Sequence, residues 1–232
     1  MSSRYSICLD KPSIEKRFGI NATDDYHPRF NAAPGQLLPV ISSGAPNGFS
    51  YFYWGQSQAW SKNKTISDKL IHADFHQVKE KPHFLRALES KRCLVPADGF
   101  YIWKTVGKRS KIPYRVTLYP QETFCFPGLW EEYEDENDQT VFTFKIILLP
   151  ANPIVAEIDT HMPAILAREN EVQWLDATTS MANLLSILGS SAPGNMTKYT
   201  VSPNINRINF DERSLIAPAP AADQFGNYRL FD

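Results

Sequence analysis

Cysteine, long apolar runs and charge of one sign are all scarce in this sequence of 232 residues. The three cysteines, Cys8, Cys93 and Cys125, form no C-x-x-C pair, and such a low, odd count is typical of a reducing compartment rather than of a disulfide scaffold. No run of about 18 apolar residues is present, which excludes a membrane-spanning helix. The N-terminal segment also lacks the apolar core of a signal peptide. These absences predict a cytoplasmic protein that does not contact a membrane.

The charges of the chain nearly cancel, because 24 basic and 25 acidic residues give a net charge of −1. Such a chain has no bulk positive field that would attract nucleic acid or an anionic membrane. A role with DNA therefore requires a local patch of positive charge. The acidic run at 131–138 is interpreted as a solvated loop tip rather than as a binding tail.

Aromatic residues make up 12% of the chain, and prolines number 17. This mixture favours many short strands and turns over long helices. Apolar runs predict strands at 37–42, 50–54, 69–76, 92–103, 112–119, 123–131, 140–149 and 197–202. Within the run 92–103, Asp98-Gly99 is interpreted as a turn between two strands. The pattern predicts a β-rich α+β fold with a barrel-like sheet.

Helical spacing of apolar residues predicts helices at 11–19 and 82–91, and two further helices within 168–189. Ser13 and Thr179 are the expected caps of the first helix and the last one. Residues 217–232 are expected to form an irregular tail. The whole chain, residues 1–232, is interpreted as one domain.

Six motifs, taken together, are similar to one known family. They are FNAAPG at 30–35, FYWGQSQAW at 52–60, KRCLVPADGFYIWK at 91–104, FPGLWEE at 126–132, HMPAIL at 161–166 with WL at 174–175, and YTVSPNINR at 199–207. Their order and spacing resemble the SRAP domain, the SOS-response-associated peptidase family, whose members include abasic-site processing proteins. The resemblance covers nearly the whole chain. It implies a SRAP-like barrel-type sheet with peripheral helices.

The resemblance also implies a chemistry that can be checked position by position. In the family, removal of Met exposes an N-terminal Cys, whose amine attacks the abasic aldehyde and whose thiol closes a thiazolidine. This sequence has Ser2 at the Cys position and Ile102 at the position of a Glu that transfers protons. A serine hydroxyl is far less nucleophilic than a thiolate, and an isoleucine side chain transfers no proton. We therefore expect stable crosslinking to be lost.

The other catalytic positions of the family are replaced as well. His72 stands where the family has an Asn, and Asp74 replaces an Arg of the DNA groove. An ungapped match places Asp159 at the position of the family's catalytic His and His161 at the position of an Arg. A shift of two residues in the loop would instead place His161 at the position of the catalytic His. On this interpretation Ser2 and His161 are the candidate catalytic residues.

Several positions of the DNA groove still match the family. The resemblance implies DNA contacts from Arg4, Asn31, Pro34, Trp60 and Asn206. An arginine can hold a phosphate, and aromatic side chains beside a groove can stack on unpaired bases. The first hypothesis is therefore a monomeric protein that binds single-stranded or abasic-site DNA in a DNA-damage response, as a pseudoenzyme and with no cofactor.

Three alternatives remain open from the sequence. One is an active SRAP-type peptidase or abasic-site processing enzyme with altered residues, and another is an interaction module with no DNA role. The third is a hydrolase with a divalent metal bound by some of His72, Asp74, His76, Asp159 and His161. Because residues four apart on a strand lie about 13 Å from each other, at most two ligands from 72–76 could share an ion with Asp159 or His161.

Overall fold

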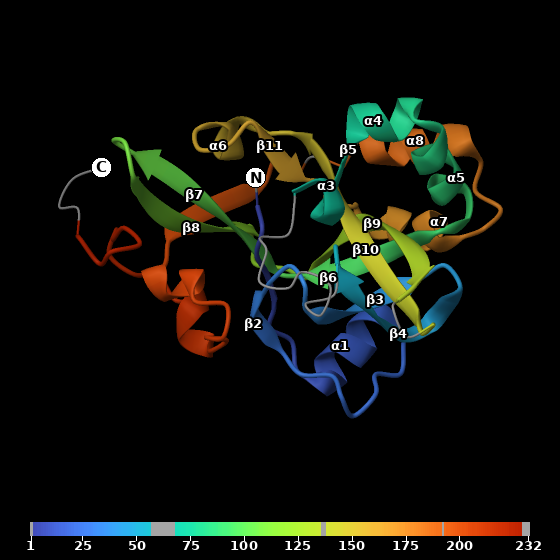
Figure 1. The fold of residues 1–232 in the computed structure, drawn as a ribbon, viewed down its shortest axis with the longest axis horizontal. Coiled ribbons are helices and arrows are strands. Elements are labelled where there is room, and N and C mark those ends of the chain that lie inside the picture. Colours follow the sequence, from blue (N-terminus) through green and yellow to red (C-terminus); the bar gives the residue numbers. More distant parts are fainter. Residues whose placement is uncertain (1, 57–67, 136–137, 192, 229–232) are drawn as a thin grey trace.

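The computed structural model describes residues 2–56, 68–135, 138–191 and 193–228. These residues form two β-sheets with helices around them (Figure 1). The five-stranded sheet is antiparallel and has the strand order β12-β8-β7-β1-β2. Its strands are β1 (Tyr5–Ile7), β2 (Arg29–Ala32), β7 (Gly99–Val106), β8 (Ser110–Leu118) and β12 (Met196–Thr200).

The seven-stranded sheet has the order β11-β10-β4-β3-β6-β9, and β9 also pairs with β10. That last pairing closes five of its strands into a barrel, which confirms the barrel-type sheet expected from the sequence. The strands of this sheet are β3 (Leu37–Ser42), β4 (Ala45–Trp54), β5 (His72–Asp74), β6 (Arg92–Ala97), β9 (Phe124–Glu134), β10 (Thr140–Pro150) and β11 (His161–Pro163). Strand β5 adds to β10 in parallel.

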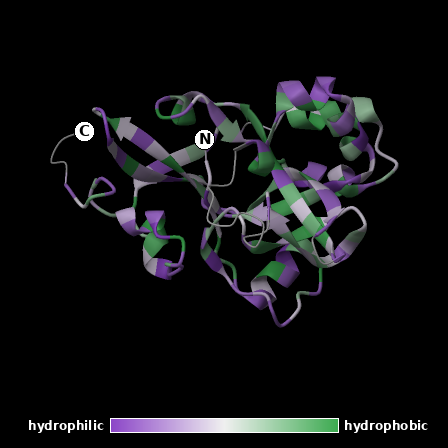
Figure 2. Cartoon of the chain, in the orientation of Figure 1, coloured by the Kyte–Doolittle hydropathy of each residue, from purple (hydrophilic) through white to green (hydrophobic). Residues whose placement is uncertain are grey.

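Strand β6 of the barrel buries both of its faces. In β6 the side chains alternate, so that Cys93 and Val95 join the apolar cluster inside the barrel while Leu94 joins a second cluster outside it. Helices supply the other half of that second cluster, for example through Leu88 and Trp174. Figure 1 shows these helices together on one side of the barrel, and Figure 2 shows their mixture of hydrophobic and hydrophilic residues. They are α4 (Phe75–Glu80), α5 (Pro82–Ser90), α7 (Glu171–Leu175) and α8 (Met181–Gly189).

The remaining helices are short. They are α1 (Lys11–Phe18), α3 (Asp68–Ile71), α6 (Pro153–Ala156) and the 3-10 helices η1 (Arg168–Asn170), η2 (Pro203–Asn206) and η3 (Arg213–Ile216). Within the described ranges, none of the helices is long and apolar enough to cross a membrane. After η3 the described chain has only isolated bridges, Val201 with Pro218 and Ala222 with Tyr228, as expected for an irregular tail.

Two of the predicted helix caps are wrong by a few residues. The cap of α1 is Asp10, whose carboxylate accepts a hydrogen bond from the backbone N–H of Ser13, and the cap of α8 is Ser180 instead of Thr179. Both caps have an extended backbone, as a residue just outside the first helical turn requires. Ser13 already lies inside that turn and therefore donates to the cap.

The strand predicted at 69–76 is also wrong in its extent. The chain there forms the end of α3, then β5, and then α4. Asp74 stops the strand, because its carboxylate accepts hydrogen bonds from the backbone N–H groups of His76 and Gln77 and caps α4. Alternation along a strand therefore does not govern the directions of the side chains beyond Asp74.

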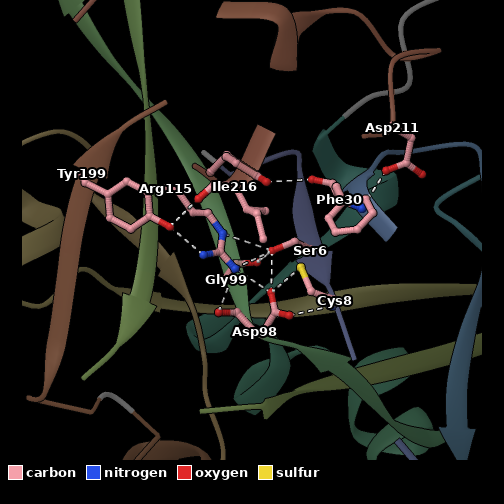
Figure 3. Close-up of polar contacts among 10 residues, drawn as sticks. Ser6, Cys8, Phe30, Asp98, Gly99, Arg115, Tyr199, Asp211 and Ile216 are labelled. Carbon is pink, nitrogen blue, oxygen red and sulfur yellow. Dashed lines mark hydrogen bonds and ion pairs between the residues drawn. The ribbon is translucent and has the colours of Figure 1, made fainter. Parts of the chain in front are cut away.

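Asp98 is a buried joint between the two sheets rather than part of a hairpin turn. The chain leaves β6 in one sheet and enters β7 in the other at this residue. The Asp98 carboxylate accepts hydrogen bonds from Ser6 Oγ at 2.7 Å and from the backbone N–H of Cys8, and it pairs with the Arg115 guanidinium at 2.7 Å (Figure 3). Arg115 also donates to the hydroxyl of Tyr199. This buried network joins β1, β8 and β12 to the start of β7. The predicted break between two strands at Asp98-Gly99 is present, but the two strands belong to different sheets and do not form a hairpin.

Gly99 makes room for this network. A Cβ atom added there would lie 2.7 Å from Nε and 2.9 Å from Cζ of Arg115. The guanidinium cannot move aside without breaking its pair with Asp98. We therefore expect Gly99→Ala to lower the free energy of unfolding by about 1–3 kcal/mol, as overpacking does.

Urea unfolding measures this change, and Gly44→Ala is the matched control, because nothing lies within 4 Å of a Cβ added at Gly44. Equal unfolding midpoints for Gly99→Ala and Gly44→Ala would contradict the proposed close approach.

Candidate nucleic-acid site

A cavity of about 580 Å³ lies where the start of the chain meets the β7–β8 hairpin and the loop between α6 and β11. Figure 1 shows the N-terminus between these elements. The lining includes charged, polar and aromatic side chains of Arg4, Trp103, Lys111, Asp159 and Asn206. We name it the Arg4 cavity.

Arg4 is a largely buried cation in this wall. Its Nη1 donates to the carbonyl of Ser3 at 2.7 Å, whereas its buried Nε has no hydrogen-bond partner in the part of the chain that the structure describes. Burial lowers the pKa of Arg4 to about 10, so the guanidinium still carries its charge at neutral pH. Nor does any carboxylate of the described residues form an ion pair with it. Such a cation is suited to bind an anion that enters the cavity.

Trp103 and Asn206 form the opposite part of the wall. The indole N–H of Trp103 donates to Asn206 Oδ1 at 3.0 Å, and Asn206 Nδ2 donates to the carbonyl of Pro203. Asn206 thus lines the cavity and orients the indole ring, and its predicted DNA contact stays a prediction. Trp103 was not among the predicted site residues, although strand alternation gives the signal. Ile102 belongs to the apolar core, so the side chain of its neighbour points the other way.

Ser2 and Ile102 are the residues that the motif resemblance matches to the family's Cys and Glu. Ser2 is 3% exposed, and its hydroxyl donates to the carbonyl of Arg4 at 3.1 Å. Ile102 is 1% exposed and packs in the core. Neither side chain offers a free proton-transfer group.

Asp159 and His161 line different cavities, although the backbone N–H of His161 donates to Asp159 Oδ1 at 3.4 Å. Asp159 lies at the Arg4 cavity, whereas His161 begins β11 and lines a second cavity, of about 360 Å³, together with His72 and Asp74. His161 Nε2 is 3.6 Å from Asp74 Oδ2, and His161 Nδ1 shares a hydrogen bond of 3.0 Å with the Thr160 hydroxyl. The hydroxyl, imidazole and carboxylate therefore lie in series, but the second contact is longer than a hydrogen bond.

The structure gives the metal hypothesis no support. Among the described residues, which include all five, no group of three or more His, Cys, Asp or Glu side chains is placed to hold a metal ion. The physical reason is local. Asp74 uses its carboxylate to cap α4, His76 lies on that helix, and His72 is buried edge-on against Trp54, with 6.1 Å between the ring centroids.

The other predicted DNA contacts lie elsewhere. Asn31 is fully buried, and its side-chain amide donates to the carbonyls of Ile205, Arg207 and Phe210, which gives the predicted DNA contact no support. Pro34 is half-buried in the turn between β2 and β3. The prediction for Trp60 lies outside the described residues.

The fold and this N-terminal cavity define a SRAP-type protein, and the sequence comparison agrees. The chain belongs to the SOS response associated peptidase (SRAP) family, whose model matches residues 1–208. This confirms the resemblance inferred from the motifs.

Relatives and solved structures match over most of the chain. Abasic site processing protein YoqW of Bacillus subtilis is 35% identical over 211 residues, which cover 89% of this chain and 94% of that protein. Abasic site processing protein YoaM of the same organism is 37% identical over 206 residues, covering 88% and 89%. A crystal structure of a protein from Bacteroides thetaiotaomicron has the same fold, with a TM-score of 0.79, 23% identity, and coverage of 93% of this chain and 99% of that one.

Proposed function

We propose that this chain binds single-stranded or abasic-site DNA at the Arg4 cavity in a DNA-damage response, and that it does not form a stable N-terminal crosslink. One observation carries the proposal: Arg4 is a largely buried cation whose Nε lacks a partner among the described residues. A DNA phosphate supplies the charge and the acceptor oxygens that this group lacks. The names of the curated relatives, abasic site processing proteins, support DNA as the partner.

The loss of crosslinking follows from the atoms at positions 2 and 102. A thiazolidine requires an amine and a thiol on adjacent carbons, and Ser2 supplies only a hydroxyl. That hydroxyl is buried and donates to the Arg4 carbonyl, and the side chain of Ile102 has no proton to transfer. The α-amine that removal of Met1 would expose can still form a Schiff base, but this adduct is reversible.

The experiment mixes the protein with abasic single-stranded DNA and compares native and denaturing gels. We expect a shifted band on the native gel and no band that survives heating in detergent. Ser2→Cys is the matched variant, because it restores the missing thiol, and we expect it to give a heat-stable band. A heat-stable band from the unaltered protein would overturn the proposed loss of crosslinking.

An enzyme with altered residues is the alternative function, and it rests on Thr160, His161 and Asp74. Because the contact between His161 and Asp74 is 3.6 Å long, this series supports catalysis less strongly than Arg4 supports binding.

We further propose that residues 1–232 form one domain and that the protein acts as a monomer in the cytoplasm.

A further inference from the structure

The tip of the β7–β8 hairpin concentrates positive charge in a chain whose net charge is −1. Residues 104–111 read KTVGKRSK, with four cations and no acidic residue. Lys108, Arg109 and Lys111 are exposed, and within the described ranges no carboxylate forms an ion pair with any of them. Lys111 also lines the Arg4 cavity, so the basic surface is continuous with the proposed site.

A C-terminal turn, residues 222–228, is attached along this hairpin. Ser110 Oγ donates to Asp223 Oδ2 at 2.8 Å, and the backbone N–H of Lys111 donates to Gln224 Oε1 at 2.6 Å. Gln224 Nε2 in turn donates to the carbonyl of Arg109 at 2.7 Å. Figure 1 shows this end of the chain beside the hairpin. The SRAP family model ends at residue 208, so the turn lies beyond the matched region.

The turn is built around the carboxylate of Asp223. This carboxylate accepts hydrogen bonds from the backbone N–H groups of Phe225 and Asn227 as well as from Ser110. Burial raises the pKa of Asp223, but the hydrogen bonds outweigh burial and lower it to about 2, so the carboxylate stays ionised at neutral pH. The backbone is thereby fixed, yet Phe225 is 70% exposed and Tyr228 is 72% exposed. Two aromatic side chains are thus held in solvent next to a cluster of cations.

We propose that the hairpin tip and the C-terminal turn form an arm that binds the single strand of DNA leaving the Arg4 cavity. Lys108, Arg109 and Lys111 contact its phosphates, and Phe225 and Tyr228 stack on unpaired bases. The occupant is a single strand because its bases are free to stack and its backbone matches the positive charge. This inference rests on the proposed function, since it extends the same binding site.

Fluorescence anisotropy with a labelled, undamaged oligothymidine of about 20 nucleotides tests the arm at several salt concentrations. The double variant Phe225→Ala/Tyr228→Ala removes the stacking surface, and we expect it to weaken binding by at least about tenfold. Lys108→Gln/Arg109→Gln should lower the slope of log affinity against log salt by about 1.4, because two phosphate contacts on a single strand are lost.

The control is Tyr119→Ala, which removes another exposed aromatic residue, 73% exposed, just beyond the opposite end of β8. This variant should bind as the unaltered protein does, and thermal unfolding verifies that all variants are folded. The variant Arg4→Met tests the cavity itself. If Arg4→Met weakens DNA binding but Phe225→Ala/Tyr228→Ala binds with unchanged affinity, the proposed arm is wrong and the proposed function stands. Absence of binding by the unaltered protein at low salt would overturn both.

Discussion

Replacing Asp98 by asparagine is expected to lower the free energy of unfolding by about 3–5 kcal/mol, the usual cost of breaking a buried ion pair. Arg115 is fully buried, and its guanidinium lies 2.7 Å from the Asp98 carboxylate. Burial by itself lowers the pKa of Arg115, but the charge of Asp98 together with Tyr199 and Tyr101 outweighs burial, and the pKa is raised. Asparagine keeps the shape of the side chain and removes the charge, which leaves a buried cation without compensation.

Urea unfolding is the measurement, and an exposed ion pair provides the control. Lys11 and Asp24 are also 2.7 Å apart, but both side chains are in solvent, so Asp24→Asn should leave the unfolding midpoint unchanged. The double variant Asp98→Asn/Arg115→Met should recover part of the loss, because it removes the stranded charge. Equal midpoints for Asp98→Asn and Asp24→Asn would show that the network does not stabilise the joint between the sheets.

Arg4→Met is expected to weaken binding of single-stranded DNA by about 10- to 150-fold, the range for one charged hydrogen-bonding contact of about 1.5–3 kcal/mol. The same change should leave the free energy of unfolding unchanged or raise it. The reason is that Arg4 is largely buried and its Nε has no partner in the described part of the chain, so removing the charge relieves a desolvation cost. In Arg4→Met we therefore expect the affinity for DNA to fall without a fall in the free energy of unfolding.

Anisotropy and urea unfolding of the same preparation measure both quantities. Arg86→Met is the control, because Arg86 is exposed on α5 and its Nε donates only to the carbonyl of Pro82. This variant should preserve both affinity and stability. If Arg4→Met instead lowers stability and retains affinity, Arg4 is a structural residue and the cavity is not the DNA site.

Local patterns were sufficient for much of the fold. Helix α5 matches the predicted 82–91 within one residue, and β3 matches 37–42, because helical spacing and apolar runs report directly on local burial. The prediction at 69–76 failed beyond Asp74 because the carboxylate of that residue caps a helix by accepting two backbone hydrogen bonds, which ends the strand. Periodicity carries no information about such a cap.

The candidate site was predictable only where family motifs fix a position. Three of the residues that those motifs select, Arg4, Asp159 and Asn206, line one cavity, while their predicted roles stay predictions. The motifs did not show that Asn31 is buried or that Trp103 faces the site, because both facts depend on which side of a strand meets a distant segment.

By itself, the sequence determined the strand-rich class and the SRAP family, since these depend on residue identity and order. Only the tertiary structure decided that Asp98 pairs with Arg115, that the Nε of Arg4 is buried and unpartnered among the described residues, and that residues 222–228 lie along the β7–β8 hairpin. The contacts of Arg115 and of residues 222–228 join segments that are separated in the chain. The burial of the Arg4 Nε is in turn a result of such packing. The folded packing, rather than any local pattern, sets the distances and charges on which binding depends.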